Sequence, residues 1–281
     1  MIPKSSKFLL TLVFSICFYF LLQIRATTTN CSSGVMETTQ TTHIFILSGQ
    51  SNMAGRGGVY NGEWNKLVPP ECQPNPRILR FSAESEWVEA NVPLHADIDV
   101  TKVCGIGPGM IFANNYLPVC AAKTVVGLVP CAIGGTAIAE WEKGEKLYND
   151  MLARAVLALE KAGSGGAIKG VLWYQGESDT DTKSHADVYK AKMKKLIFDV
   201  RSDLCQPALP FIQVALASGL EEDLIDLVRE AQLSINLPNV LCVDAKSLPL
   251  KPDNLHLTTD AQVMLGEMLA GAYVTHFNDF I

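Results

Sequence analysis

The sequence predicts an α/β protein, a three-layer α/β/α sandwich with a mostly parallel five-stranded sheet. Five short apolar runs, rich in β-branched and aromatic residues, have the character of buried parallel strands. Helical patterns alternate with these runs, which implies right-handed crossovers and helices on both faces of the sheet. No internal repeat or low-complexity tract divides the chain. About 250 residues follow the N-terminal segment, enough to fill one domain of this class.

The N-terminal segment has the features of a secretory signal peptide. Lys4 and Lys7 precede an apolar stretch that runs from Phe8 to Ile24, and small polar residues follow it. We expect cleavage near Ala26, secretion to the extracellular space or cell wall, and no stable membrane insertion afterwards. The apolar stretch approaches the length of a membrane span, so a membrane tether through an uncleaved signal anchor is the alternative. The expected division is a signal peptide at 1–26, a flexible segment at 27–42 and an enzymatic domain at 43–281.

Composition and cysteine content limit the partners and the covalent framework. The net charge is −6 and Lys and Arg form no cluster, which argues against nucleic acid as a partner. Seven of the eight cysteines lie outside the signal peptide, an odd number that leaves one thiol unpaired in a monomer. Cys131 and Cys242 lie in apolar runs and are expected to be small buried residues. Cys72 and Cys104, in loop-like sequence, are the preferred disulfide pair.

Short motifs indicate one modification site and no metal site. Asn30 begins an Asn-Cys-Ser sequence and is a candidate glycosylation site, with an unused motif in a flexible segment as the alternative. No Cys and His cluster has the spacing of a zinc site, so no metal is expected.

The first strand is expected over His43–Leu47, where an apolar run ends at Ser48-Gly49 and leads to Ser51. The irregular stretch 59–107 follows. Within it, 77–81 and 86–89 alternate like short strands and predict a surface hairpin. Insertions of this length are uncommon unless they are functional, so we interpret this stretch as a wall of a substrate cleft.

The middle of the chain repeats the strand and helix alternation. Pro108 marks the start of a helix whose apolar pattern covers 110–116. A second strand is expected at 124–129, and Gly134-Gly135-Thr136 then leads into a pair of amphipathic segments that ends near Ala162. The third strand, 168–174, continues into Gln175-Gly176-Glu177.

The last third predicts three helices and two strands. The pattern of 185–204 places its apolar residues along one side of a helix. A strand at 211–217, a helix at 221–235 and a strand at 239–243 follow. Thr258 resembles an N-cap for a final helix that reaches about residue 275.

The carboxyl ends of parallel strands converge at one edge of the sheet, where such folds carry their chemistry. Ser51 would be the nucleophile and His256 its base, because imidazole is matched to neutral pH. Asp253, three residues before His256, would hold the ring and stabilise the imidazolium. His43 lies at the wrong end of the sheet, and His276 lies near the C-terminus. His95 and His185 lack a local orienting acid as persuasive as Asp253.

The negative charge that develops on the ester oxygen needs fixed donors. The backbone N–H groups of Ser51 and Gly134 are candidates, with Gly135 as the rival of Gly134. The side-chain amide of Gln175 is the third candidate. Glu177 either supports His256 or Ser51 from behind, or caps a loop.

The motifs GQSNMAG, GGT, WYQGES and DNLH, in this order and spacing, resemble those of SGNH/GDSL-type hydrolases, whose fold is flavodoxin-like. More narrowly, the chain is similar to plant carbohydrate esterases related to sialate O-acetylesterases and to acetyl xylan esterases of carbohydrate esterase family six. The resemblance covers Ile44 to about Phe277. It implies a triad of Ser51, His256 and Asp253 and oxyanion donors at Ser51, Gly134 and Gln175.

The chain departs from the wider SGNH pattern in two motifs. Gln50 precedes the serine where aspartate is usual, and Gln175-Gly176-Glu177 replaces a motif with asparagine. Both features suit the narrower group of carbohydrate esterases. They leave open whether Gln175 or Glu177 takes the asparagine's role.

These observations predict a secreted serine esterase that removes acetyl or other short acyl groups from carbohydrates or polysaccharides, without metal or cofactor. A carbohydrate O-acetyltransferase with the same site is one alternative, and an inactive glycan-binding protein is another. Four tryptophans are available as sugar-stacking surfaces, and two of them are equally expected in the core: Trp64, Trp87, Trp141 and Trp173, the last two being the core candidates.

Overall fold

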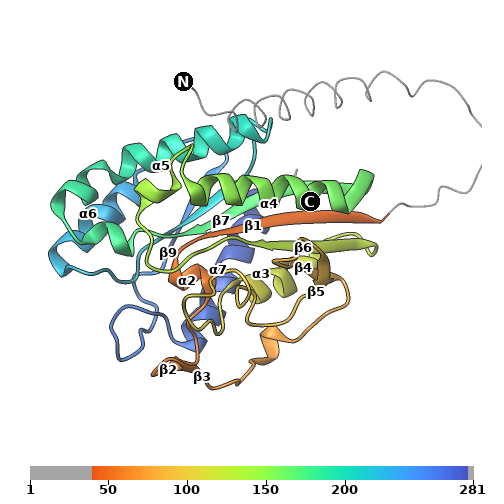
Figure 1. Ribbon diagram of the computed structural model, residues 1–281, viewed down its shortest axis with the longest axis horizontal. Coiled ribbons are helices and arrows are strands. Elements are labelled where there is room, and N and C mark those ends of the chain that lie inside the picture. The colour runs from red at the N-terminus through yellow and green to blue at the C-terminus, as the bar shows by residue number, and fades with distance from the viewer. Residues whose placement is uncertain (1–39, 278–281) are drawn as a thin grey trace, which may run out of the picture.

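A central sheet of seven strands, six of them parallel, organises the computed structural model, which describes residues 40–277 (Figure 1). The strand order is β5-β4-β6-β1-β7-β8-β9. The five predicted strands are all present: β1 (Thr41–Gly49), β6 (Thr124–Pro130), β7 (Gly166–Tyr174), β8 (Phe211–Ala215) and β9 (Val240–Asp244). The predicted signal peptide and the motif at Asn30 lie outside the described residues. The sheet begins at Thr41, two residues before the expected start of the domain.

The predicted hairpin exists, but it is part of the sheet and accounts for the two additional strands. It is formed by β4 (Ile78–Phe81) and β5 (Trp87–Glu89), which pair antiparallel. β4 also pairs parallel with β6, with Ile78 opposite Val126. Ile78 and Phe81 are fully buried, and this burial favours the sheet over an isolated position on the surface. The expectation of a five-stranded sheet is corrected accordingly.

Helices cover both faces of the sheet, as Figure 1 shows. α4 and α5 lie on one face, with α6 packed beside α5, and α3 and α7 pack together on the other face. The bounds are α3 (Gly109–Tyr116), α4 (Lys146–Ala162), α5 (Lys183–Asp203), α6 (Glu222–Leu233) and α7 (Thr259–His276). Each matches a predicted helical segment to within a few residues at its ends. The Thr258 hydroxyl accepts the N–H of Ala261, which confirms the predicted N-cap of α7.

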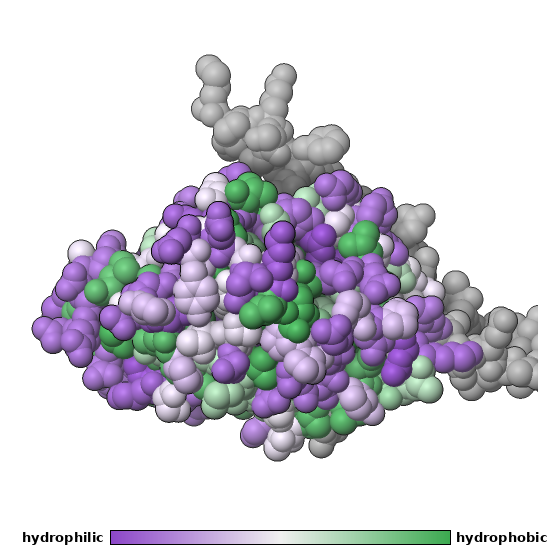
Figure 2. Space-filling model, turned by 90° about the horizontal axis from the view of Figure 1, so that it is seen from below, coloured by the Kyte–Doolittle hydropathy of each residue, from purple (hydrophilic) through white to green (hydrophobic). Residues whose placement is uncertain are grey.

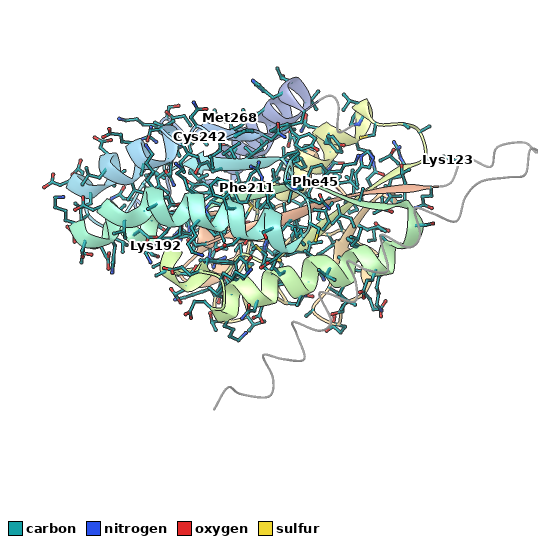
Figure 3. All side chains as sticks on the ribbon, turned by 90° about the horizontal axis from the view of Figure 1, so that it is seen from above. Phe45, Lys123, Lys192, Phe211, Cys242 and Met268 are labelled. Carbon is teal, nitrogen blue, oxygen red and sulfur yellow. The ribbon has the colours of Figure 1, made fainter. Side chains whose placement is uncertain are left out.

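Aromatic side chains fill the core on both sides of β1 and β7. Phe45 meets Phe112 and Tyr273 edge to face, which joins β1 to α3 and α7. On the opposite side Trp173 meets Trp141 edge to face. Figure 3 shows Phe45 and Phe211 in the interior of the protein and Lys192 at its periphery.

The tryptophans therefore divide between core and surface. Trp141 and Trp173 are fully buried and cannot stack on a sugar. Trp87 packs on Phe81, and its indole N–H donates to the carbonyl of Ala158. Trp64 is the remaining sugar-stacking candidate.

The cysteines differ from expectation in two ways. Cys72 and Cys104 are both free, so the preferred disulfide is not formed. The Cys104 thiol instead lies 3.4 Å from a guanidinium nitrogen of Arg56. Cys131 is buried as predicted, whereas Cys242 is only partly buried because β9 is an edge strand.

Within residues 40–277, no three His, Cys, Asp or Glu side chains are grouped in a way that could hold a metal ion. None of the helices described is both long and apolar enough to span a bilayer.

Candidate active site

Ser51 lies at the carboxyl end of the central strand because the turn after β1 admits only glycine. Gly49 has φ of +124°, and a Cβ there would lie 2.1 Å from the carbonyl oxygen of Tyr174 on the neighbouring strand. The chain then turns into the short helix α2 (Ser51–Ala54). Ser51 is its first residue and is 5% exposed.

Ser51, His256 and Asp253 form one chain of hydrogen bonds. Nε2 of His256 lies 3.0 Å from the Ser51 Oγ, and Nδ1 lies 2.9 Å from Oδ2 of Asp253. The other carboxylate oxygen of Asp253 accepts the backbone N–H groups of Leu255 and His256. The carboxylate therefore fixes both the loop backbone and the ring. The structure brings together the three residues that were predicted as a triad.

The surroundings of these hydrogen-bonded residues shift the pKa values of both Asp253 and His256. Burial alone would raise the pKa of Asp253, but hydrogen bonds from the His256 backbone and ring and from Leu255 lower it well below its usual range. Burial and the charges of Lys251 and Arg56 lower the pKa of His256, and together they outweigh the Asp253 carboxylate, which raises it. His256 is therefore neutral at neutral pH, the form that can accept a proton.

Lys251 is a second charged residue on this loop, beside Asp253, and the sequence analysis did not single it out. Its ammonium lies 3.4 Å from Oδ2 of Asp253 and over the ring of Tyr60, 5.4 Å from the centroid. Tyr60 ends β2 (Val59–Tyr60), which pairs antiparallel with β3 (Glu63–Trp64), so Lys251 joins the loop of His256 to the β2–β3 hairpin. The side chain is 7% exposed, so solvent screens its charge little.

Replacing Lys251 with methionine is expected to shift the acid limb of the kcat/KM profile to higher pH. The substitution removes a nearby positive charge, so the imidazolium of His256 becomes easier to form and its pKa rises. His256 must be neutral to act as a base, so activity is then lost at a higher pH on acidification. The profile is measured with a small acetyl ester. The control is Lys246→Met, which removes an exposed lysine from the same segment between β9 and α7 and should leave the acid limb unchanged. An acid limb in Lys251→Met at the same pH as in the wild type would contradict the prediction.

A buried ion pair lies beside Ser51, and the sequence analysis missed it. The guanidinium of Arg56 binds the carboxylate of Asp99, and their side chains are 6% and 0% exposed. Oδ2 of Asp99 also accepts the backbone N–H of Gly134 at 3.1 Å. A Cβ on Gly134 would lie 2.5 Å from Arg56 and 3.4 Å from the Cβ of Ser51. The glycine at position 134 thus lets this ion pair approach the nucleophile.

Two of the predicted oxyanion donors, Gly134 and Gln175, are engaged with acceptors of the protein. Gly134 donates to Asp99, and the Gln175 amide donates to Thr136 O at 2.9 Å and to Asp179 Oδ2 at 2.5 Å. Gly135 has φ of +79°, and no atom lies within 4 Å of where its Cβ would be. The roles of Gly134, Gly135 and Gln175 as donors to an oxyanion stay predictions.

Glu177 begins the 3₁₀ turn η5 (Glu177–Thr180) and does not contact His256 or Ser51 through a hydrogen bond. One carboxylate oxygen accepts the side-chain amide of Asn52 at 2.7 Å. Burial raises the pKa of Glu177 to about 7, against the opposing effect of this hydrogen bond.

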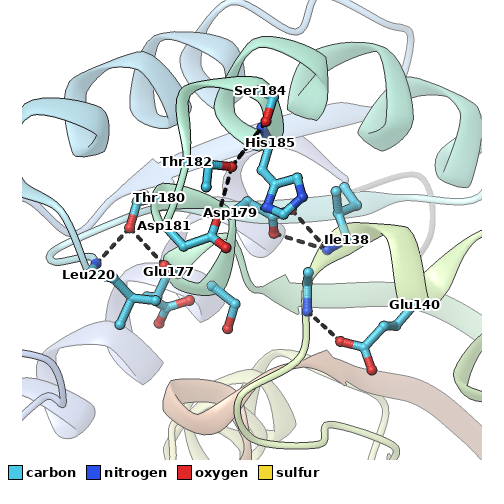
Figure 4. Close-up of polar contacts among 12 residues, drawn as sticks. Ile138, Glu140, Glu177, Asp179, Thr180, Asp181, Thr182, Ser184, His185 and Leu220 are labelled. Carbon is cyan, nitrogen blue, oxygen red and sulfur yellow. Dashed lines mark hydrogen bonds and ion pairs between the residues drawn. The ribbon is translucent and has the colours of Figure 1, made fainter.

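The turn η5 is fixed to its neighbours by the polar contacts in Figure 4. Asp179 accepts the backbone N–H of Ile138, and the Thr180 hydroxyl donates to Glu177 O and accepts from Leu220 N. Burial raises the pKa of Asp179 to about 6. These contacts give Glu177 a fixed position beside Asn52.

Of the other histidines, His43 and His185 lie away from the triad, and His95 is buried with its Nε2 3.5 Å from the carbonyl oxygen of Leu47. His43 is at the amino end of β1 and contacts the hydroxyl of Tyr116 at 2.8 Å. His185 does have a carboxylate partner, Asp181 at 2.6 Å, but this pair is exposed on the surface at the start of α5.

An open groove of about 550 Å³ lies next to the Arg56 and Asp99 pair. Cys104 belongs both to this groove and to the contacts of Arg56. The face that carries the β2–β3 hairpin is mainly hydrophilic, with small separate apolar areas (Figure 2). The groove is lined by Glu63, Trp64, Lys66, Pro93, Ala96, Lys102, Val103 and Cys104.

Comparison with known proteins gives the family. The family model described as "Carbohydrate esterase, sialic acid-specific acetylesterase" matches residues 41–275. The chain belongs to this family. It is therefore a carboxylic ester hydrolase of the carbohydrate acetylesterase class.

Individual relatives agree with membership of this carbohydrate esterase family. The probable carbohydrate esterase At4g34215 of Arabidopsis thaliana is 58% identical over 243 residues, 83% of this chain and 91% of that protein. The crystal structure of the same Arabidopsis protein superposes with a TM-score of 0.79 and 56% identity, covering 85% of this chain and 100% of that one.

Two more distant structures share the fold. NanS superposes with a TM-score of 0.66 at 17% identity, covering 85% of this chain and 98% of NanS. XAC1771, a carbohydrate acetylesterase from Xanthomonas citri, superposes with a TM-score of 0.58 at 23% identity, covering 82% and 55%.

Proposed function

We propose that the protein is a secreted serine esterase that hydrolyses O-acetyl esters on carbohydrates through Ser51, His256 and Asp253. The observation that carries the proposal is the hydrogen-bonded chain from Ser51 through His256 to Asp253, with distances of 3.0 and 2.9 Å. A hydroxyl, a neutral imidazole and an ionised carboxylate in this order are the groups that acyl transfer by a serine requires.

The reaction has two halves. The Ser51 Oγ attacks the acetyl carbonyl carbon while Nε2 of His256 takes the hydroxyl proton. The bond from that carbon to the sugar oxygen then breaks, and His256 returns the proton to this oxygen. In the second half, water attacks the acetyl-serine with His256 as base, which releases acetate and restores Ser51. Asp253 stabilises the imidazolium in both halves.

The oxyanion of each tetrahedral intermediate needs donors beside Ser51. The backbone N–H of Ser51 is at the start of α2, where helical N–H groups have no acceptor within the helix. A second donor comes from the Gly134-Gly135 turn or from Gln175. Gly134 and Gln175 would have to exchange the carboxylates of Asp99 and Asp179 for the oxyanion.

The names of the relatives support an acetylated carbohydrate as the substrate. The family model names a sialic acid-specific acetylesterase, and the Xanthomonas protein is a carbohydrate acetylesterase. The groove beside Arg56 supports the binding of a sugar chain beyond the acetylated unit, because the Trp64 indole and polar side chains line it. Secretion is supported by the signal-like segment of residues 1–26.

The test measures acetate release from acetylated xylan oligosaccharides and from O-acetylated sialic acid, with and without an excess of unacetylated acceptor sugar. We expect acetate to account for the acetyl groups lost in both cases, and a serine-directed phosphonate to modify Ser51. Acetyl groups that appear mainly on the acceptor would indicate an acetyltransferase. Glycan binding with neither acetate release nor modification of Ser51 would indicate a glycan-binding protein.

A further inference from the structure

Asn52, the residue after Ser51, has a fully buried side chain that contacts the loop of His256 on both sides of the histidine. Its Nδ2 donates to the carbonyl of Leu255 at 3.2 Å, and its Oδ1 accepts the N–H of Leu257 at 2.9 Å. His256 lies between these two leucines. One side chain therefore connects the backbone beside the nucleophile to the backbone beside the base.

Glu177 fixes which way round the amide of Asn52 lies. Its carboxylate accepts the second Nδ2 proton at 2.7 Å, so the donor side of the amide faces Glu177 and Leu255, and the acceptor side faces Leu257. Glu177 is 1% exposed, and its other carboxylate oxygen has no hydrogen-bond partner among residues 40–277. Burial of a carboxylate costs free energy. The structural contribution of the buried Glu177 carboxylate is its hydrogen bond with Asn52.

Side chains from two other parts of the chain also hydrogen-bond to Asn52 and to the His256 loop. The side chain of Gln262 on α7 donates to the carbonyl of Asn52 at 3.0 Å. The Ser218 hydroxyl, after β8, donates to the carbonyl of Leu255 at 2.6 Å. α2 and the histidine loop are thus held together by hydrogen bonds between side chains and backbone groups.

We propose that Asn52 is a positioning residue that sets the place of His256 relative to Ser51, and that Glu177 orients the Asn52 amide for this purpose. The inference rests on the proposed function, because it concerns the geometry of the same reaction. Because Asn52 is adjacent to Ser51 and holds the His256 loop, it fixes the position of that loop relative to the nucleophile. Errors of about 1 Å between reacting groups can cost about a hundredfold in rate.

The test exchanges the donor and acceptor between the two side chains. In Asn52→Asp, two carboxylates face each other and Leu255 loses a donor, so kcat for a small acetyl ester should fall about a hundredfold with little change in KM. Glu177→Gln keeps an acceptor oxygen in the same place and should retain kcat within a few-fold. In the double variant, the new amide at 177 can donate to the new carboxylate at 52, so about a tenfold part of the lost kcat should return.

The control is Asn149→Asp, which changes an exposed asparagine whose amide donates to the carbonyl of Gly144 and should not alter kcat. If Asn52→Asp does not fold, Asn52→Ser replaces it, since serine is neutral but too short to reach Glu177 and Leu257. A folded Asn52 variant with the kcat of the wild type overturns the positioning role. A double variant that is as slow as Asn52→Asp overturns the part assigned to Glu177.

A second measurement is independent of turnover. NMR titration of the His256 ring should give a pKa closer to the usual 6.5 in Asn52→Ser than in the wild type, because a displaced loop loses burial. The charged groups that face the ring, Asp253, Lys251 and Arg56, are unchanged in that variant. If the wild type failed to hydrolyse any ester, the proposed function would fall, while the titration would still decide the positioning role. An unchanged pKa of His256 would overturn it.

Discussion

Replacement of Ser51 by alanine is expected to lower kcat/KM for acetyl esters by about 10⁴- to 10⁶-fold. Among residues 40–277, the Ser51 Oγ has one hydrogen-bond partner, Nε2 of His256, and no other side chain there occupies a nucleophile's position beside that nitrogen. The loss of one nearly buried hydroxyl should change the free energy of unfolding by about 1 kcal/mol or less. Hydrolysis rates and urea unfolding of the two proteins are compared side by side.

Ser48→Ala provides a matched control for Ser51→Ala. Ser48 is fully buried near the end of the same strand, and its hydroxyl has no hydrogen-bond partner within residues 40–277. Its removal should leave turnover unchanged. Substantial hydrolysis by a well-folded Ser51→Ala protein would rule out the serine mechanism.

Replacement of Arg56 by methionine is expected to reduce the free energy of unfolding by about 3–5 kcal/mol. Asp99 has no exposed side-chain surface, so without the guanidinium its charge stays buried and unpaired. One of its oxygens already lacks a hydrogen-bond partner among the residues described. The free energy of unfolding is measured by urea titration, with circular dichroism as the signal.

Two further variants identify the cause of that loss. Arg80→Met removes the partner of Asp97 from a more exposed ion pair, with side chains 17% and 28% exposed, and should cost on the order of 1 kcal/mol. The double variant Arg56→Met with Asp99→Leu removes both charges and should be more stable than Arg56→Met alone. Equal costs for Arg56→Met and Arg80→Met would show that burial of the first pair has no special weight.

The sequence was sufficient to predict the strands that carry the site, because burial on both faces leaves a visible apolar run. The run before Ser51 and the run before Gln175 are of this kind, and both strands lie in the middle of the sheet. Ser51, Asp253 and His256 were singled out because each follows such a strand or has a local spacing typical of a triad. A one-dimensional pattern is enough when the signal is local.

Features that depend on contacts between distant segments were missed. The pairing of β4 with β6 joins residues about 48 positions apart, as in Ile78 and Val126, and leaves no local pattern. Arg56 stands in the glycine-rich stretch after Ser51, which was a usable signal, whereas nothing around Asp99 marked it as its partner. The disulfide between Cys72 and Cys104 was wrong because loop-like sequence does not reveal that both thiols are buried separately.

The central position of β1 has a consequence for the order in which the protein assembles. β1 pairs only with β6 and β7, so its ladder cannot close before the chain has been made as far as Tyr174. His256 is 205 residues beyond Ser51 and is delivered by the connection that precedes the last helix. Contacts of such sequence separation form slowly and late in folding. During refolding, ester hydrolysis should therefore return later than secondary structure. Its return then marks the completed folding of the whole domain.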